Sequence, residues 1–178
     1  MRQARETDTR APGSFANLER AAFDRYAPEL FGILAGNMSV IAPTGNTREE
    51  DYAVWYQALS RRMQEESWQI VLIFEASTEK LIGYFQYSLS GEVFMMEEVQ
   101  IALPYQGKYG LFRSLFAFVL PKMEPNIAFV EAYVNRNNVK SMAILERMGL
   151  QKIGCNKNGN SFHYRGSFSD LLRWFSGR

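Results

Sequence analysis

Two adjacent carboxylates, Glu97 and Glu98, stand in the apolar run MMEEVQIAL at residues 95–103. A carboxylate held in apolar surroundings has a raised pKa and can serve as a general base, directly or through a water molecule. The run predicts a strand, in which adjacent side chains point to opposite faces, so one carboxylate should reach a cleft while the other meets solvent or a salt bridge. We favour Glu98 as the base because it shares a face with Gln100, and we keep Glu97 as the alternative.

A turn with two glycines follows this strand in the sequence ALPYQGKYGLFRSLF, residues 102–116. The turn leads directly into an apolar helix, and the first N–H groups of a helix are unpaired and carry partial positive charge. Gly107 and Gly110 allow close backbone approach, while Lys108 and Arg113 add full charges. Such a turn can hold a phosphate group, although an ordinary connection between a strand and a helix requires glycine just as often.

A second segment, VNRNNVKSMAILERMGLQKIG at residues 134–154, reads as a strand end, an Asn-Asn break, a short amphipathic helix, a glycine stop and a new strand. It contains the pattern N-x-x-S-x-x-x-L-E-x-x-G-L. In this order the two segments resemble the GNAT superfamily of acetyl-CoA-dependent N-acyltransferases. The second segment is similar to the branch that includes the ribosomal-protein N-terminal acetyltransferases. The resemblance covers most of the chain from about Leu18 onward and is clearest over residues 81–154.

The resemblance implies acetyl-CoA as a co-substrate whose pyrophosphate lies on the glycine turn. The family pattern is Q/R-x-x-G-x-G/A. Here Gln106 matches the first position, Tyr109 and Leu111 occupy the later glycine positions, and Gly110 lies between them. The resemblance also places a backbone N–H of a bulged and splayed fourth strand, 99–103 here, at the thioester carbonyl, which is equivalent to an oxyanion hole. The residues that it assigns to coenzyme A are Val99, Ile101, Gln106, Gly107, Lys108, Tyr109, Gly110, Leu111, Phe112, Asn138 and Ser141.

Two positions of the second segment have open interpretations. Asn138 would contact the arm of coenzyme A, but asparagine is also a good helix N-cap for purely local reasons. Where many relatives carry a tyrosine thought to protonate the departing thiolate, this chain has Leu145, which cannot donate a proton. A water molecule could replace that tyrosine, and the other replacements that the sequence permits are Ser141, Tyr105, Tyr109, Tyr133 and His163.

The activity implied by the resemblance is transfer of an acetyl group to a primary amine by direct attack in a ternary complex. The acceptor would be an N-terminal α-amine or a small-molecule amine. A non-catalytic acyl-CoA-binding or interaction module of the same fold stays open, because Leu145 replaces the expected acid. A nucleotide-binding protein that uses the same turn is a third possibility, and the absence of a G-x-x-x-x-G-K-[ST] run counts against it.

Composition excludes several other classes of function. With 20 basic and 19 acidic residues among 178, the net charge of +1 argues against a nucleic-acid or polybasic membrane surface. The single Cys155 cannot form an internal disulfide, and the single His163 cannot belong to a histidine-rich metal site. The first residues lack the apolar segment of a signal peptide, and no run approaches the roughly 20 apolar residues of a membrane span. We therefore expect a cytoplasmic protein without a metal, nucleic-acid or membrane partner.

The elements that must position these residues form a mixed α/β fold, with a mostly antiparallel central sheet flanked by helices. We expect residues 1–14 to be disordered and residues 15–178 to form a single domain. A proline in a helix interior costs about 3 kcal/mol. Pro28 therefore predicts a helix that begins at 24–27 and ends by residue 36, after a first strand at 15–23. Thr47 and Glu50 form a capping box that opens the next helix.

The remaining elements follow from periodicity and turn residues. Three antiparallel strands are expected at 68–76, 81–89 and 92–103, followed by the apolar helix 111–122. The second half should contain strand 127–134, helix 139–148, and strands 150–156 and 161–168. The Asn158-Gly159 pair predicts a hairpin between the last two strands. One or two helical turns should end the chain at 169–175.

Overall fold

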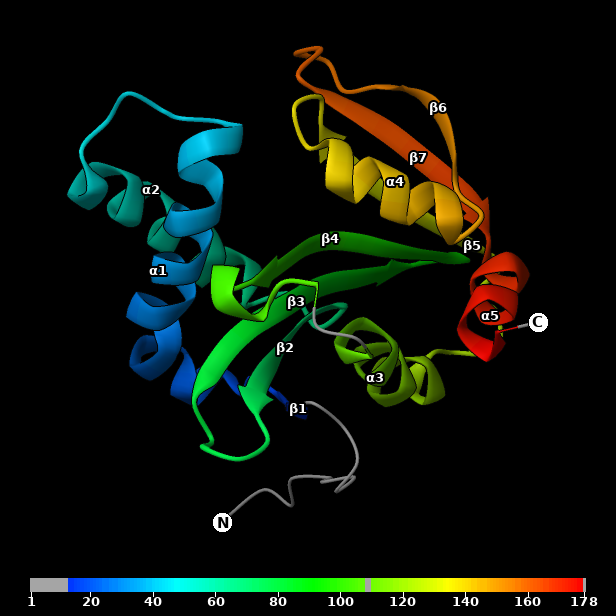
Figure 1. Cartoon of the computed structure of the whole chain (residues 1–178), viewed down its shortest axis with the longest axis horizontal. Helices are drawn as coiled ribbons and strands as arrows, with labels where there is room; N and C mark the ends of the chain where they lie inside the picture. Colours follow the sequence, from blue (N-terminus) through cyan, green and yellow to red (C-terminus); the bar gives the residue numbers. More distant parts are fainter. Residues whose placement is uncertain (1–12, 108–109, 178) are drawn as a thin grey trace. The chain divides into compact units, whose positions relative to one another are not determined.

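Residues 13–107 and 110–177 are described by a computed structural model (Figure 1). Their strands form a seven-stranded sheet in the order β1-β2-β3-β4-β5-β7-β6. The described chain divides into two compact units: the first contains residues 13–86 and 98–122, and the second contains residues 87–97 and 123–177. Strands β3 and β4 supply residues to both units. The expected mixed, mostly antiparallel sheet with flanking helices is confirmed.

The first unit carries the N-terminal strands and three helices. Its elements are β1 (Gly13–Asn17), α1 (Phe23–Ile41), α2 (Arg48–Arg62), β2 (Trp68–Glu75), the first part of β3 (Leu81–Ser90), the last part of β4 (Val93–Ile101) and α3 (Leu111–Val119). The capping box of Thr47 and Glu50 opens α2 as predicted, with both reciprocal hydrogen bonds present. β1 begins at Gly13, two residues before the expected start of ordered structure, and residues 1–12 lie outside the described part.

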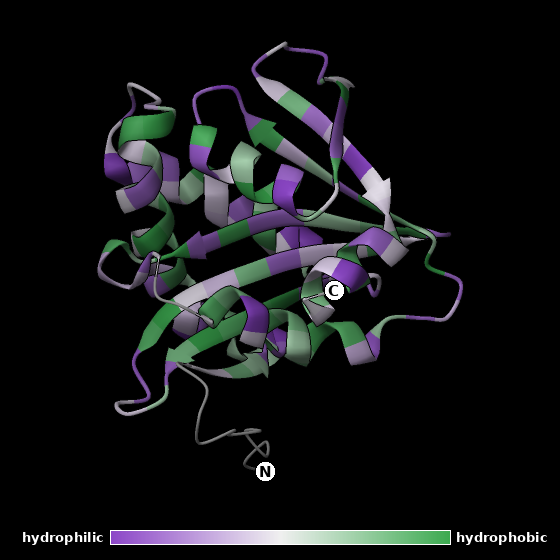
Figure 2. Cartoon of the chain, turned by 45° about the vertical axis from the view of Figure 1, so that its right-hand side comes forward, coloured by the Kyte–Doolittle hydropathy of each residue, from purple (hydrophilic) through white to green (hydrophobic). Residues whose placement is uncertain are grey.

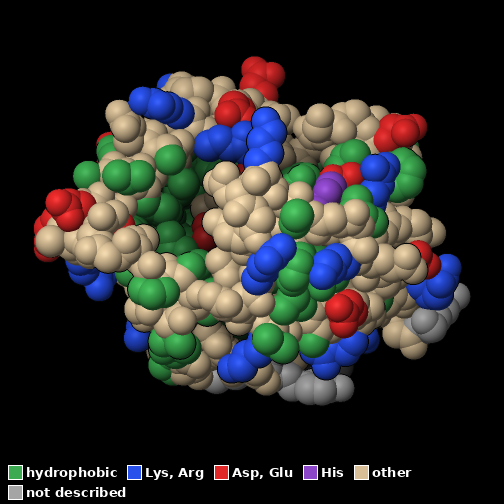
Figure 3. Space-filling view, turned by 90° about the horizontal axis from the view of Figure 1, so that it is seen from above, with side chains coloured by type: hydrophobic (Ala, Val, Ile, Leu, Met, Phe, Trp, Pro, Cys, Tyr) green, Lys and Arg blue, Asp and Glu red, His purple; other side chains and the backbone are tan. Residues whose placement is uncertain are grey.

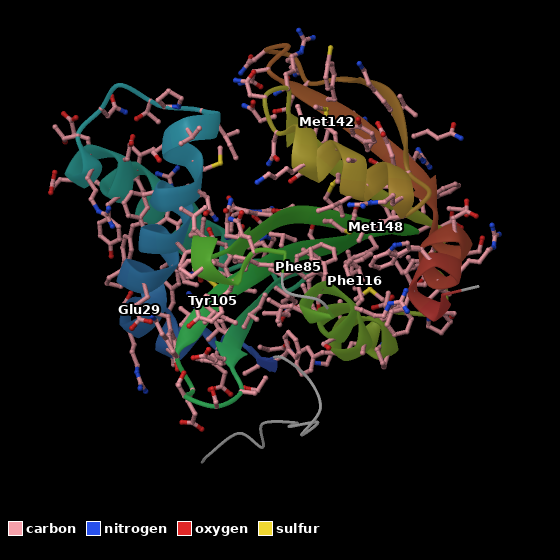
Figure 4. The ribbon with its side chains drawn as sticks, in the orientation of Figure 1. Glu29, Phe85, Tyr105, Phe116, Met142 and Met148 are labelled. Carbon is pink, nitrogen blue, oxygen red and sulfur yellow. The ribbon has the colours of Figure 1, made fainter. Side chains whose placement is uncertain are left out.

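The core of this unit lies on both faces of the sheet. On one face α1 and α2 pack on alternate residues of β2: Trp68, Ile70, Leu72 and Phe74. On the other face α3 packs through Phe116 against Phe85 of β3, with ring centroids 6.0 Å apart (Figure 4). Because β2 is covered on both faces, its sequence is apolar at nearly every position. Elsewhere in the sheet, strands in the middle of Figure 2 carry white and purple residues as well as hydrophobic green ones.

The helix predicted from Pro28 is wrong at both ends. α1 begins at Phe23, runs through Pro28 and Gly36 and ends at Ile41, and the expected strand 15–23 is divided between β1 and a 3-10 turn, Arg20–Ala22. Pro28 removes only one backbone hydrogen bond near the helix start. The side chains of Leu30 and Phe31 are buried, and burial of such a side chain contributes about 1.5–3 kcal/mol. Packing therefore offsets the cost of the proline.

The second unit contains the ends of β3 and β4 that flank their turn and the C-terminal elements. These are β5 (Phe129–Asn135), α4 (Val139–Arg147), β6 (Gln151–Cys155), β7 (Ser161–Ser167) and α5 (Phe168–Ser176). β5 pairs with β4 in parallel and with β7 antiparallel, and β6 pairs with β7. The predicted hairpin at Gly159 is present, with φ of 67° at that residue. Met148, the C-cap residue of α4, is fully buried (Figure 4).

Candidate active site

β4 contains a β-bulge at the adjacent carboxylates. The two-residue turn at 91–92 places Ser90 opposite Val93, and Ala102 donates its N–H to the carbonyl of Ile82 across 2.8 Å. From Ser90 back to Ile82 there are eight residue steps along β3, whereas from Val93 to Ala102 there are nine along β4. One extra residue is therefore inserted in β4, which is the definition of a bulge.

The bulge brings Glu97 and Glu98 to the same face of the sheet. Ser88 donates its hydroxyl to Glu97 across 2.6 Å, and Tyr84 donates its hydroxyl to Glu98 across 3.1 Å. Ser88 and Tyr84 lie four residues apart on β3, so they share a face. The expectation that the two carboxylates point to opposite faces is therefore wrong, because regular alternation does not hold across a bulge.

Glu98 accepts hydrogen bonds from two side chains of the first unit. Besides Tyr84, Gln100 donates its side-chain Nε2 to Glu98 across 3.1 Å, which agrees with the prediction that these two residues share a face. Gln100 is buried and in turn accepts a hydrogen bond of 2.8 Å from Nδ2 of Asn37. A continuous chain of hydrogen bonds thus joins α1 to Glu98.

Burial is the largest cause that raises the pKa of Tyr84 well above its usual value, and the negative charge of Glu98 and the hydrogen bond to it add to the effect. The phenol therefore stays protonated and remains a donor at neutral pH. Tyr84 and Gln100 thus place one donor on each oxygen of the Glu98 carboxylate.

The same chain extends to the glycine turn. Gln106 donates Nε2 to Oδ1 of Asn37 across 3.1 Å and to the carbonyl oxygen of Ile101 across 2.9 Å. Asn37 also donates to the Ile101 carbonyl, across 3.0 Å. Gln106, the first residue of the expected phosphate loop, is therefore anchored to both α1 and the end of β4.

The described part of the loop has two glycines in the left-handed region before the start of α3. Gly107 has φ of 73° and Gly110 has φ of 91°, both in the left-handed region that favours glycine. Gly110 is the N-cap of α3, and the first turn of α3 contains no acidic residue. Leu111 is buried and Phe112 packs on Phe116, so they fix the start of the helix. Lys108 and Tyr109 lie outside the described residues.

The remaining candidates on β4 lie on the opposite face. After the bulge, Val99 and Ile101 alternate with Glu98 and Gln100, so their side chains face away from the carboxylate. The parallel ladder with β5 runs from the pair Val93–Phe129 to the pair Met96–Ala132, whereas β4 continues to Ile101. The ladder between β4 and β5 therefore ends before residues 99–103, for which the resemblance implies a bulge, and a backbone N–H of that stretch at the thioester carbonyl stays a prediction.

A groove of about 570 Å³ lies beside this network in the first unit. α1 lines one side of it through Ile33, Gly36 and Asn37, and the residues that follow β4 line the other side through Leu103 and Pro104. Figure 4 shows two labelled residues of these elements, Glu29 and Tyr105. Asn37 thus lines the groove, and its side-chain amide belongs to the chain of hydrogen bonds that reaches Glu98.

In the second unit, Asn138 acts as the N-cap of α4. Its side chain accepts a hydrogen bond of 3.1 Å from the backbone N–H of Ser141, which is the local function that the sequence left open. Leu145 is buried, with 7% of its surface exposed. A contact of Asn138 or Ser141 with coenzyme A stays a prediction.

His163 is paired with a carboxylate in the second unit. Its Nε2 lies 2.8 Å from Glu131, which also contacts Arg165 at 3.3 Å, and its ring stacks on Tyr133 with centroids 4.4 Å apart. The imidazole, purple in Figure 3, is visible at the surface beside basic side chains. These contacts hold the imidazole in place on β7.

Within residues 13–107 and 110–177, no three histidine, cysteine, aspartate or glutamate side chains are grouped so that they could hold a metal ion. The helices of the same residues include none with the length and apolarity to span a membrane.

Sequence reasoning missed Asn37 and Tyr84. Asn37 follows Leu30 and Ile33 at helical spacing, so it continues the stripe that faces the sheet. A polar side chain within such a stripe was the available signal. Tyr84 gave no signal, because a tyrosine in an apolar strand reads as a core residue.

No protein-family model and no curated protein matches the chain. Solved structures do match it. The PaiA N-acetyltransferase of Thermoplasma acidophilum in complex with coenzyme A has a TM-score of 0.68 and 14% identity, covering 86% of this chain and 98% of its own. The ribosomal-protein-S5-alanine acetyltransferase of Vibrio fischeri has a TM-score of 0.63 and 16% identity, covering 95% and 99%. A variant of the SpeG spermidine N-acetyltransferase of Vibrio cholerae has a TM-score of 0.58 and 15% identity, covering 90% and 96%.

At these identities the likeness establishes the fold. The chain has the fold of the GNAT acetyltransferases, which confirms the resemblance read from the two sequence segments.

Proposed function

We propose that this protein is an acetyl-CoA-dependent N-acetyltransferase that acetylates a primary amine, either a peptide N-terminus or a small-molecule amine. The observation that carries the proposal is the hydrogen-bonded Glu98 on a bulged strand that leads directly into the glycine turn of α3. Two neighbours in fold are named as acetyltransferases of a ribosomal protein and of spermidine, and a third was solved with coenzyme A, which supports an amine acceptor.

The reaction follows from the functions of a few groups. The turn at Gly107 and Gly110 would bind the pyrophosphate through backbone N–H groups at the start of α3. Glu98, with Glu97 as the alternative, would take a proton from the acceptor ammonium, directly or through water. The free amine nitrogen then forms a bond to the thioester carbonyl carbon, the carbon–sulfur bond breaks, and the nitrogen gives its surplus proton to water. A backbone N–H of β4 beyond Met96 would stabilise the oxyanion, and the thiolate takes a proton from water.

Energetics favour an α-amine as the acceptor. An α-amine of pKa about 8 costs about 1 kcal/mol to deprotonate at pH 7, whereas a lysine of pKa near 10.4 costs more than about 4 kcal/mol. The candidate base is a carboxylate and Leu145 offers no acid, so the amine that is easier to deprotonate is the better substrate.

Two measurements test the proposal. Mass spectrometry of protein purified without denaturation should detect retained coenzyme A or acetyl-CoA. A panel of peptides with free N-termini and of small amines should release coenzyme A from acetyl-CoA, with a matching mass increase of the acceptor. Tight binding of coenzyme A without release from any acceptor would overturn the enzymatic function in favour of a non-catalytic acyl-CoA-binding module, which the buried Leu145 favours.

A further inference from the structure

We infer that Asn37 of α1 is a positioning residue that holds Glu98 and the start of the phosphate loop in one geometry. The inference rests on the proposed function, because it assigns Asn37 to the site of that reaction. Asn37 makes three side-chain hydrogen bonds, of 2.8, 3.0 and 3.1 Å, to Gln100, to the Ile101 carbonyl and to Gln106. Gln100 in turn donates to Glu98, and Gln106 is the first residue of the expected phosphate loop.

The orientation of every amide in this chain is fixed by the groups at its two ends. An ionised carboxylate only accepts hydrogen bonds, so Gln100 must turn its Nε2 toward Glu98 and its oxygen toward Asn37. Asn37 must then offer Nδ2 to Gln100, which leaves Oδ1 for Gln106. The carbonyl of Ile101 also only accepts, and it receives Nδ2 of Asn37 and Nε2 of Gln106. A flip of Asn37 would break bonds at both ends of the chain.

Asn37 is placed to transmit this constraint because α1 is itself held rigidly. Leu30 lies about two turns before Asn37 on the same face of the helix. It is fully buried in the core of the first unit, and Ile33 packs against that core. The helix thus fixes the amide, and the amide fixes Gln100 and Gln106. The backbone alone does not fix the side-chain conformation of either glutamine, because each side chain has several rotatable bonds.

Three single variants separate the effect of these hydrogen bonds on coenzyme A binding from their effect on Glu98. Gln106→Ala should raise the dissociation constant of coenzyme A about tenfold, the value of one hydrogen bond, without moving the pH dependence of the rate. Gln100→Leu should move the acidic limb of the pH–rate profile upward by about 0.5 to 1 unit, because Glu98 loses a donor to its charged form. Asn37→Ala should show both effects, since both glutamines lose their common partner.

The double variant Asn37→Ala/Gln106→Ala should bind coenzyme A no more weakly than the weaker single variant, because both changes remove the same contact. Ser39→Ala is the matched control on the same helix. Its hydroxyl bonds only to the carbonyl of Gly36, so neither readout should change. If Asn37→Ala does not fold, Asn37→Asp replaces it: the carboxylate still accepts from Gln106 but has no proton for Gln100, so the acidic limb should still move.

Failure of the proposed function and failure of the inference about Asn37 would give different results. Absence of turnover and of coenzyme A binding in the unmodified protein would remove the proposed function, and this inference with it. An active protein in which Asn37→Ala lowers thermal stability alone, with wild-type affinity for coenzyme A and a wild-type pH profile, would leave the proposed function intact and overturn the positioning function of Asn37.

Discussion

Tyr84 donates its hydroxyl hydrogen to Glu98 across 3.1 Å from a side chain that has no exposed surface. Burial, together with the charge of Glu98 and the hydrogen bond to it, raises the pKa of this phenol well above its usual value. The pair connects the core of the first unit, which contains Tyr84, to the candidate catalytic carboxylate. A change at Tyr84 should therefore affect both stability and the carboxylate.

Tyr84→Phe should lower the free energy of unfolding by about 1–2 kcal/mol, because Glu98 loses a hydrogen-bond donor while the ring still packs. The raised pKa of Tyr84 in the folded state also makes stability depend on pH. Its contribution to stability is present below the unfolded value of about 10 and is lost as pH rises above it, because the unfolded state alone releases the proton.

Urea unfolding between pH 8 and 11 measures this slope. The unmodified protein should lose stability more steeply above pH 10 than Tyr84→Phe does. Parallel curves for the unmodified protein and Tyr84→Phe would show that this phenol does not titrate differently on unfolding.

Glu98→Gln should lower the acetylation rate about a hundredfold at neutral pH, with partial recovery as pH rises and the acceptor amine deprotonates by itself. Glu97→Gln, the variant of the alternative base that accepts from Ser88, is measured in parallel. Steady-state rates from pH 6 to 10 compare the two, with the exposed turn residue changed in Glu92→Gln as a control. A wild-type rate in both variants would exclude the pair from the mechanism.

Gly110→Ala should weaken coenzyme A binding by about 1 to 3 kcal/mol, because φ of 91° is strained for alanine and its relief would turn the N–H groups at the start of α3. Gly45→Ala is a matched control. Gly45 also has a positive φ, of 83°, with open space around it, so it carries the same strain at a distance from the loop. Calorimetric titration with coenzyme A measures the difference, and equal affinities would place the phosphate site elsewhere.

Leu145→Tyr should lower thermal stability by about 1–3 kcal/mol without a gain in rate, because the leucine side chain is packed in the core and a phenol overfills its place. Leu145→Met, which conserves volume, should remain close to the unmodified protein in both respects. A faster rate with unchanged stability in Leu145→Tyr would show instead that the ring reaches the reacting thiolate.

Local sequence determined much of the fold, because its signals act over a few residues. The capping box at Thr47, the hairpin at Gly159 and the left-handed glycines of the turn before α3 each depend on short-range backbone preferences. The apolar run of β2 likewise required burial on both faces. These signals were sufficient to predict the order of the elements and the resemblance that the solved structures confirm as a fold.

Tertiary structure decided what local signals could not express. Pro28 lies inside α1 because the packing of Leu30 and Phe31 outweighs a local penalty. The common face of Glu97 and Glu98 depends on one extra residue in β4 relative to β3, and that count is fixed only when the two strands pair. Asn37 meets Gln106 across 69 positions of the chain, so its partner is fixed only when α1 packs on the sheet.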